Sequence, residues 1–188
     1  MKKVLLVTLL LLFSGTVFSS FAQTDSYLKN RILVEGLYLR NLGNFSQVWS
    51  TAAGGYVGYS IAFPAHNLLM MRTGFISNSL RDNTEIEDAS LTIIPLEIGG
   101  RYYFTDSRLM PFFQFINGLN IIFENINLEG EKEDKTLVKY SWQVGVGLTI
   151  NLTDNFNVDV GANYQSNFYM TEAMNTGFEY VIGLGLAL

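Results

Sequence analysis

The chain has 188 residues, and its 17 acidic side chains against 12 basic ones give a net charge of −5, which argues against a nucleic-acid-binding protein. It contains no cysteine, which excludes a disulfide framework and a thiolate metal site. Mean hydropathy is only mildly positive at +0.20, and one long apolar run occurs, at the N-terminus.

The N-terminal residues have the three parts of a secretory signal peptide. Met-Lys-Lys is followed by ten mostly apolar residues, 4–13, and by a small-x-small site at 20–22. A transmembrane anchor is the alternative, but an apolar run of ten is short of the roughly 20 residues that span a bilayer. We therefore predict a signal peptide at 1–22, cleaved after Ala22, and one mature domain at 23–188.

The rest of the chain shows the two-residue period of β-strands. Residues 139–151 alternate throughout between apolar and polar side chains. Residues 31–40 form a strand whose two faces are not separated by the pattern. In chain order the predicted strands are 31–40, 49–63, 69–79 (a weaker pattern), 91–104, 111–124, 139–151, 156–165 and 177–188.

The connectors between these strands alternate in length. Residues 64–68, 105–110 and 152–155 are short, whereas 42–47, 79–90, 125–137 and 169–176 are mostly longer and more polar. Tight turns at one end and longer loops at the other are typical of outer-membrane barrels. The predicted fold is all-β, an up-and-down antiparallel transmembrane β-barrel of about eight strands.

Two observations indicate that the apolar face meets lipid and the polar face lines the interior. Aromatic side chains lie near the ends of the apolar face, as in the girdles at membrane interfaces. The polar face carries glycines, which leave room inside a narrow barrel: Gly99, Gly118, Gly145, Gly147, Gly161, Gly183 and Gly185. The alternative is a secreted soluble barrel with its apolar face around a ligand.

Several charged residues share the polar face with these glycines. We expect them to form a paired structural network that fills the lumen, because unpaired charges held from water are costly. A conduction or proton path is the alternative, although eight strands leave no open channel. The predicted network comprises Arg72, Glu97, Arg101, Glu124, Lys139, Asp159 and Glu179.

Acidic residues gather in two of the longer connectors. They are predicted to lie in outward-facing loops as solvated surface, or else to bind divalent cations that bridge lipopolysaccharide phosphates or to contact a partner. These residues are Glu85, Glu87, Asp88, Glu129, Glu131 and Glu133.

No constellation predicts catalysis. The chain has one histidine, His66, in a predicted turn with no serine nearby in sequence. Phosphate-loop and zinc-site spacings are absent from the sequence, so we expect no enzyme activity, no cofactor and no metal site.

The signal peptide, the segment 94–104, the G-x-G segments at Gly145–Gly147 and Gly183–Gly185, and the alternating last strand resemble the small outer-membrane barrels of the OmpA, OmpX and OmpW types. The resemblance implies insertion into the bacterial outer membrane by the outer-membrane assembly machinery. We predict a monomer in contact with lipid and lipopolysaccharide, with a structural or surface-interaction role in the cell envelope. Transport of small apolar solutes is the alternative, which an open pore or a lateral gap would favour.

Overall fold

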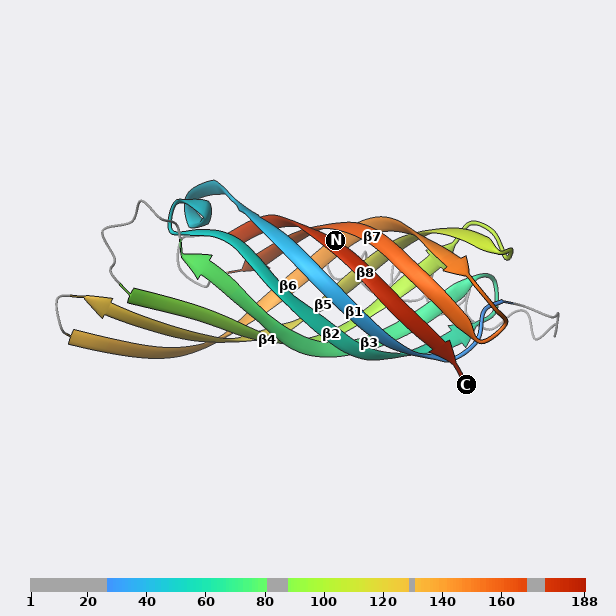
Figure 1. Ribbon diagram of the computed structural model, residues 1–188, viewed down its shortest axis with the longest axis horizontal. Helices are drawn as coiled ribbons and strands as arrows, with labels where there is room; N and C mark the ends of the chain where they lie inside the picture. Colours follow the sequence, from blue (N-terminus) through green and yellow to red (C-terminus); the bar gives the residue numbers. More distant parts are fainter. Residues whose placement is uncertain (1–26, 81–87, 129–130, 169–174) are drawn as a thin grey trace, which may run out of the picture.

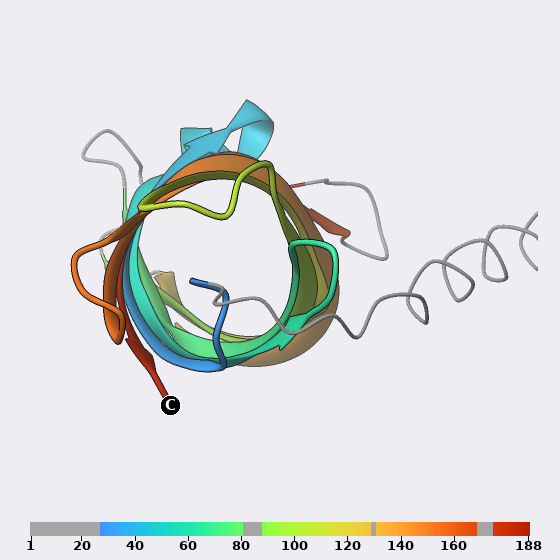
Figure 2. The same cartoon turned by 90° about the vertical axis from the view of Figure 1, so that its right-hand side faces the viewer.

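In this computed structural model, residues 27–80, 88–128, 131–168 and 175–188 are described, so the predicted signal peptide lies outside the described residues. Eight antiparallel strands close into one barrel in sequence order, with β1 paired to β8 (Figure 2). Among the described residues, no helix is long and apolar enough to cross a membrane. The strands are β1 (Arg31–Leu42), β2 (Trp49–Phe63), β3 (Asn67–Leu80), β4 (Asp88–Tyr103), β5 (Leu109–Leu128), β6 (Glu131–Asn151), β7 (Phe156–Phe168) and β8 (Asn175–Ala187). The predicted fold class is confirmed.

The two ends of the barrel differ (Figure 1). At the end we call the turn end, short connections join β2 to β3, β4 to β5 and β6 to β7, where short connectors are predicted. At the other end, the hairpin end, β5 and β6 extend beyond the rest of the barrel. A 3-10 helix, η1 (Gly43–Gln47), lies between β1 and β2 at this end.

The structure corrects the predicted connector 125–137. Apart from 129–130, these residues belong to β5 and β6, which stay in register as far as Leu128 opposite Glu131. Glu124 lies directly opposite Lys135, a favourable cross-strand pair. A hairpin that extends beyond the barrel wall needs no apolar face, so its residues lack the alternation by which the other strands are recognised.

The outward wall is apolar. Val146 is 59% exposed and Ile182 is 63% exposed, although both are aliphatic and lie within strands. Polar side chains of the same two strands, Gln143 of β6 and Glu179 of β8, are buried inside the barrel. An outward wall this apolar contradicts the alternative of a soluble barrel.

The two faces of β1, which the sequence pattern leaves unassigned, are now distinct. Ile32, Val34 and Tyr38 are exposed on the wall, whereas Leu33 and Leu37 are buried inside. Both faces are therefore apolar over much of β1, which is why the pattern is ambiguous.

The wall has two irregularities. A β-bulge occurs in β2 between Trp49 and Thr51, so Ser50 has no partner in β3. Between β3 and β4, paired positions stop at Thr73 opposite Leu96 and resume only at Ile76, and Pro95 lies in this gap. Proline has no backbone N–H to donate, and the Thr73 hydroxyl donates to the Pro95 carbonyl at 2.8 Å.

Candidate functional site

Arg72 on β3 is the centre of a charged network inside the barrel. Its Nε donates to Glu97 Oε2 at 2.7 Å, and its Nη1 donates to Glu35 Oε2 at 2.9 Å. Its Nη2 donates to Gln143 Oε1 at 2.8 Å and lies 3.5 Å from Glu179 Oε1. One guanidinium thus joins side chains from β1, β4, β6 and β8, which the closed barrel brings together.

Glu179 on β8 is completely buried but has partners for both carboxylate oxygens. The Tyr56 hydroxyl donates to Oε2 at 2.6 Å, and Asn163 Nδ2 donates to Oε1 at 2.8 Å. Arg72 also lies over the Tyr56 ring, with its guanidinium carbon 3.8 Å from the ring centroid. These contacts compensate the loss of hydration that burial imposes on a carboxylate.

A second cluster is built around Arg101 on β4. Its guanidinium forms an ion pair with Asp159 and donates from Nε to Gln114 Oε1 at 3.0 Å. Its carbon lies 3.9 Å from the centroid of the Phe112 ring, a cation–π contact. Because Arg101 Nη2 is also 3.9 Å from Glu35 Oε1, Glu35 connects the two clusters.

The two arginines are outnumbered by the acids that they contact. Four buried carboxylates surround them, and neutral donors supply the remaining hydrogen bonds. Gln143 Nε2 donates to Glu97 at 2.8 Å, and Thr149 Oγ1 donates to Asp159 at 2.7 Å. The network is therefore held in place by charged and neutral side chains from several strands around the barrel, as a structural polar core would be.

Apolar side chains pack inside the barrel on both sides of this network. On β3, Arg72 lies between Met70 of one apolar cluster and Ile76 of the other. The cluster of Met70 comprises Leu33, Leu68, Met70, Tyr103, Met110, Phe112 and Ile116. The second comprises Leu37, Leu39, Trp49, Ala52, Tyr56, Ile76, Leu91, Ile93, Ile122 and Val181.

Two glycines of the predicted G-x-G segments make room for these interior side chains. A Cβ at Gly147 would collide with the Phe112 ring on which Arg101 stacks. A Cβ at Gly183 would lie 2.8 Å from Glu35 Cγ, closer than carbon atoms approach without a shift. Glycine at these two positions thus leaves the space that the Phe112 and Glu35 side chains occupy.

Five of the predicted lumen residues take part in the ion pairs and hydrogen bonds above: Arg72, Glu97, Arg101, Asp159 and Glu179. Glu124 and Lys139 are partly buried and lie farther toward the hairpin end, on β5 and β6. Glu35 is missed by the sequence reasoning, because the faces of β1 are not separated there. Its acidic side chain within an apolar strand is the signal that could have identified it.

The predicted acidic loop residues are only partly covered by the structure. Glu85, Glu87 and Glu129 lie outside the described residues. Asp88, Glu131 and Glu133 belong to strands β4 and β6 and not to loops, and their side chains lie outside what the structure describes. Within the described segments, no group of three or more histidine or acidic side chains could hold a metal ion.

No family model matches the sequence, and no curated protein matches it. The structure is similar to Ail, the attachment invasion locus protein of Yersinia pestis (TM-score 0.62, 14% identity, covering 85% of this chain and 99% of Ail). It is also similar to Neisserial surface protein A (0.59, 13%, 85% and 97%) and to the outer membrane protein OprG from Pseudomonas aeruginosa (0.56, 10%, 88% and 99%). At these identities the likeness concerns the fold, which is that of the small eight-stranded outer-membrane barrels that the sequence resembles.

Proposed function

We propose that the protein is a non-catalytic outer-membrane barrel with a filled interior, and that its role in the cell envelope is structural or one of contact at the surface. In this proposal residues 1–22 direct export and are removed, and the assembly machinery inserts the barrel as a monomer beside lipopolysaccharide. The apolar outward wall supports the membrane location, since lipid-exposed apolar bands are the mark of such barrels.

The observation that carries the proposal is the packing of the interior. The ion-paired network and two apolar clusters occupy the lumen, and the network residues are 0–6% exposed. Side chains that are held by one another and closed off from solvent offer no route for an ion and no room for a substrate. His66 lies in the turn between β2 and β3, apart from this network.

The location is tested by expressing the full-length chain and fractionating the cells. We expect the protein in the outer-membrane fraction, with a gel mobility that changes on boiling because a closed barrel resists detergent until heated. A periplasmic or secreted protein whose mobility is the same with and without boiling would contradict the proposal.

A second candidate function, lateral passage of small apolar solutes into the bilayer, is favoured by the gap in β3–β4 pairing at Pro95. Shallow space on the outer wall is lined there by Val57, Met71, Thr73, Leu96 and Ile98, among others. The Thr73 hydroxyl bridges the gap in the structure, so passage would require that hydrogen bond to open.

The two functions differ in what the purified barrel does in a membrane. In planar bilayers we expect no stepwise conductance, because the lumen is filled. In liposomes we expect an apolar dye to enter no faster with the protein than without it. Sustained conductance would contradict a filled interior. Accelerated dye entry that is lost when a cysteine pair at positions 73 and 96 is oxidised would establish the lateral route instead.

A further inference from the structure

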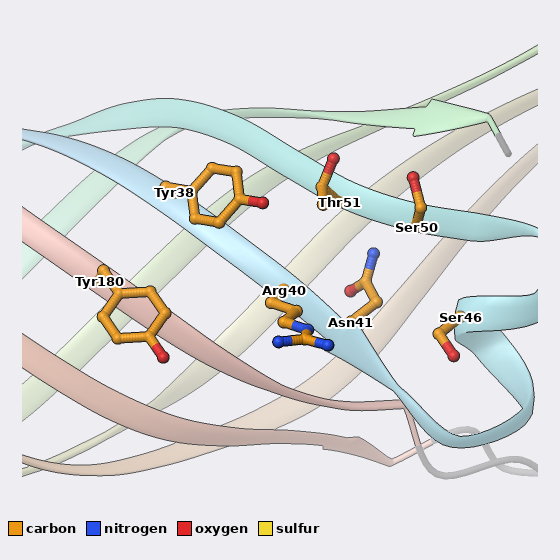
Figure 3. A pocket seen from close by; sticks show the side chains of 7 residues that line it. All are labelled: Tyr38, Arg40, Asn41, Ser46, Ser50, Thr51 and Tyr180. Atoms are coloured by element: carbon orange, nitrogen blue, oxygen red, sulfur yellow. The ribbon is translucent and has the colours of Figure 1, made fainter.

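An open cavity of about 410 Å³ lies on the outer wall near the hairpin end, where β1, β2, β8 and η1 meet. We call it the Arg40 cavity. Figure 3 shows the side chains that line it: Tyr38, Arg40, Asn41, Ser46, Ser50, Thr51 and Tyr180. It is separate from the charged network, because Arg40 points outward from the barrel.

Arg40 is unusual in its position. Among the strand residues whose side chains the structure describes, it is the one lysine or arginine at an outward position of the wall. Within residues 27–80, 88–128, 131–168 and 175–188, its guanidinium forms no ion pair and no hydrogen bond. A guanidinium stays charged and has five N–H donors, so on an apolar wall it calls for a partner beyond the residues that the structure describes.

Tyrosines flank Arg40 on the wall, toward the barrel's middle. Tyr38 and Tyr180 are directly opposed on β1 and β8, and each is half exposed. Exposed tyrosines with apolar neighbours are typical of the membrane–water interface. They place Arg40 at the depth where lipid headgroups lie.

Hydroxyl groups lie beside Arg40 on the neighbouring strand β2. Thr51 is directly opposite Arg40 in the sheet, and the bulge in β2 adds Ser50 beside it. Bulges commonly redirect a side chain in this way. Neither hydroxyl makes a side-chain hydrogen bond to a residue that the structure describes, so both are available as donors.

We propose that the Arg40 cavity binds the phosphate group of a phosphorylated lipid of the outer leaflet. A planar guanidinium and nearby hydroxyls match the oxygens of a phosphate, and none of the described residues that line the cavity is acidic. The tyrosines accommodate the apolar part of the lipid. The inference rests on the proposed function, because it requires that the barrel sit in a membrane.

The test measures binding of diphosphoryl lipid A to the refolded full chain in nonionic detergent by native mass spectrometry. We expect Arg40→Gln to weaken binding on the order of tenfold, the size of one charged hydrogen bond. Arg40→Lys keeps the charge but loses the paired N–H donors of the guanidinium, so it should weaken binding less than Arg40→Gln does. Arg108→Gln is the matched control, since Arg108 is exposed at the turn end and its removal changes the net charge equally. We expect it to bind as the wild type does.

Lipid A without phosphates should bind the wild type as weakly as diphosphoryl lipid A binds the Arg40→Gln variant. Unchanged binding by Arg40→Gln, or an equal loss in Arg108→Gln, would overturn the proposal. Displacement of the lipid by millimolar inorganic phosphate would also overturn it, in favour of a soluble anion.

Only variants whose gel mobility still changes on boiling are titrated, so misfolding cannot imitate lost binding. Fractionation and conductance test the proposed function without involving Arg40. If the barrel resides in the outer membrane but its binding of lipid A is unchanged by Arg40→Gln, the cavity assignment alone is refuted.

Discussion

Replacing Arg72 by methionine should destabilise the barrel by about 3–5 kcal/mol, the cost of removing one partner from a buried ion pair. The change leaves Glu35, Glu97 and Glu179 close together without their shared cation. The measurement is the urea midpoint of unfolding in detergent micelles, followed by the fluorescence of Trp49 and Trp142.

A double variant distinguishes charge imbalance from lost packing. Adding Glu97→Met to Arg72→Met removes one uncompensated carboxylate, so part of the stability should return. Arg108→Met, at the exposed turn, removes one 3.3 Å hydrogen bond from Nε to the Asn151 carbonyl and should change stability by no more than about 1 kcal/mol. A midpoint for Arg72→Met equal to that of Arg108→Met would show that the interior network contributes nothing to stability.

When the barrel is in lipid, a charge placed on the outward wall should destabilise it almost as much as the loss of Arg72. Val146 lies midway along the part of β6 that is paired on both sides, with Phe113 and Ala162 as its neighbours on the adjacent strands. Val146→Arg is expected to cost about 2–4 kcal/mol in bilayers, the range for arginine on the lipid face near the midplane. The measurement is urea unfolding of protein folded into lipid vesicles.

Thr153→Arg introduces the same side chain in the exposed turn between β6 and β7 and is the matched control. The Thr153 hydroxyl accepts the backbone N–H groups of Asn155 and Phe156 at 3.3 and 3.1 Å. Because these hydrogen bonds are exposed to water, their loss should cost about 1 kcal/mol, less than the change at Val146. If Val146→Arg were tolerated as well as Thr153→Arg, the outward wall would not be in contact with hydrocarbon.

Much of this architecture can be predicted from the sequence because lipid outside and a polar interior impose a two-residue period. The prediction weakens where the interior itself is apolar. Leu33 and Leu37 face inward on β1 while Ile32 and Val34 face outward, so alternation carries no information there. It also fails in the projecting hairpin, where Asp134, Lys135 and Thr136 are all exposed, so burial does not distinguish the two faces of the strand.

The site is predictable to a lesser degree. An inward position follows from alternation, as for Arg101 and Asp159. Which inward residues meet depends on the stagger of strands across the barrel, because partners such as Glu35 and Arg72 come from β1 and β3, which are not adjacent. The Arg40 cavity depends on the bulge in β2 and on the alignment of Arg40 with Thr51 across the sheet. Neither feature can be recognised from the amino-acid pattern.

The seam between β1 and β8 sets the order in which the barrel can form. Every other pairing joins consecutive strands, whereas the seam joins Arg31 to Ala187. Contacts so distant in sequence are slow to form, so the hairpins precede closure and leave two open strand edges until then. Arg72 acquires Glu35 from one side of the seam and Glu179 from the other. The network around Arg72 is therefore complete only when the seam has closed, and a chain delayed before that step exposes two strand edges along which it can aggregate.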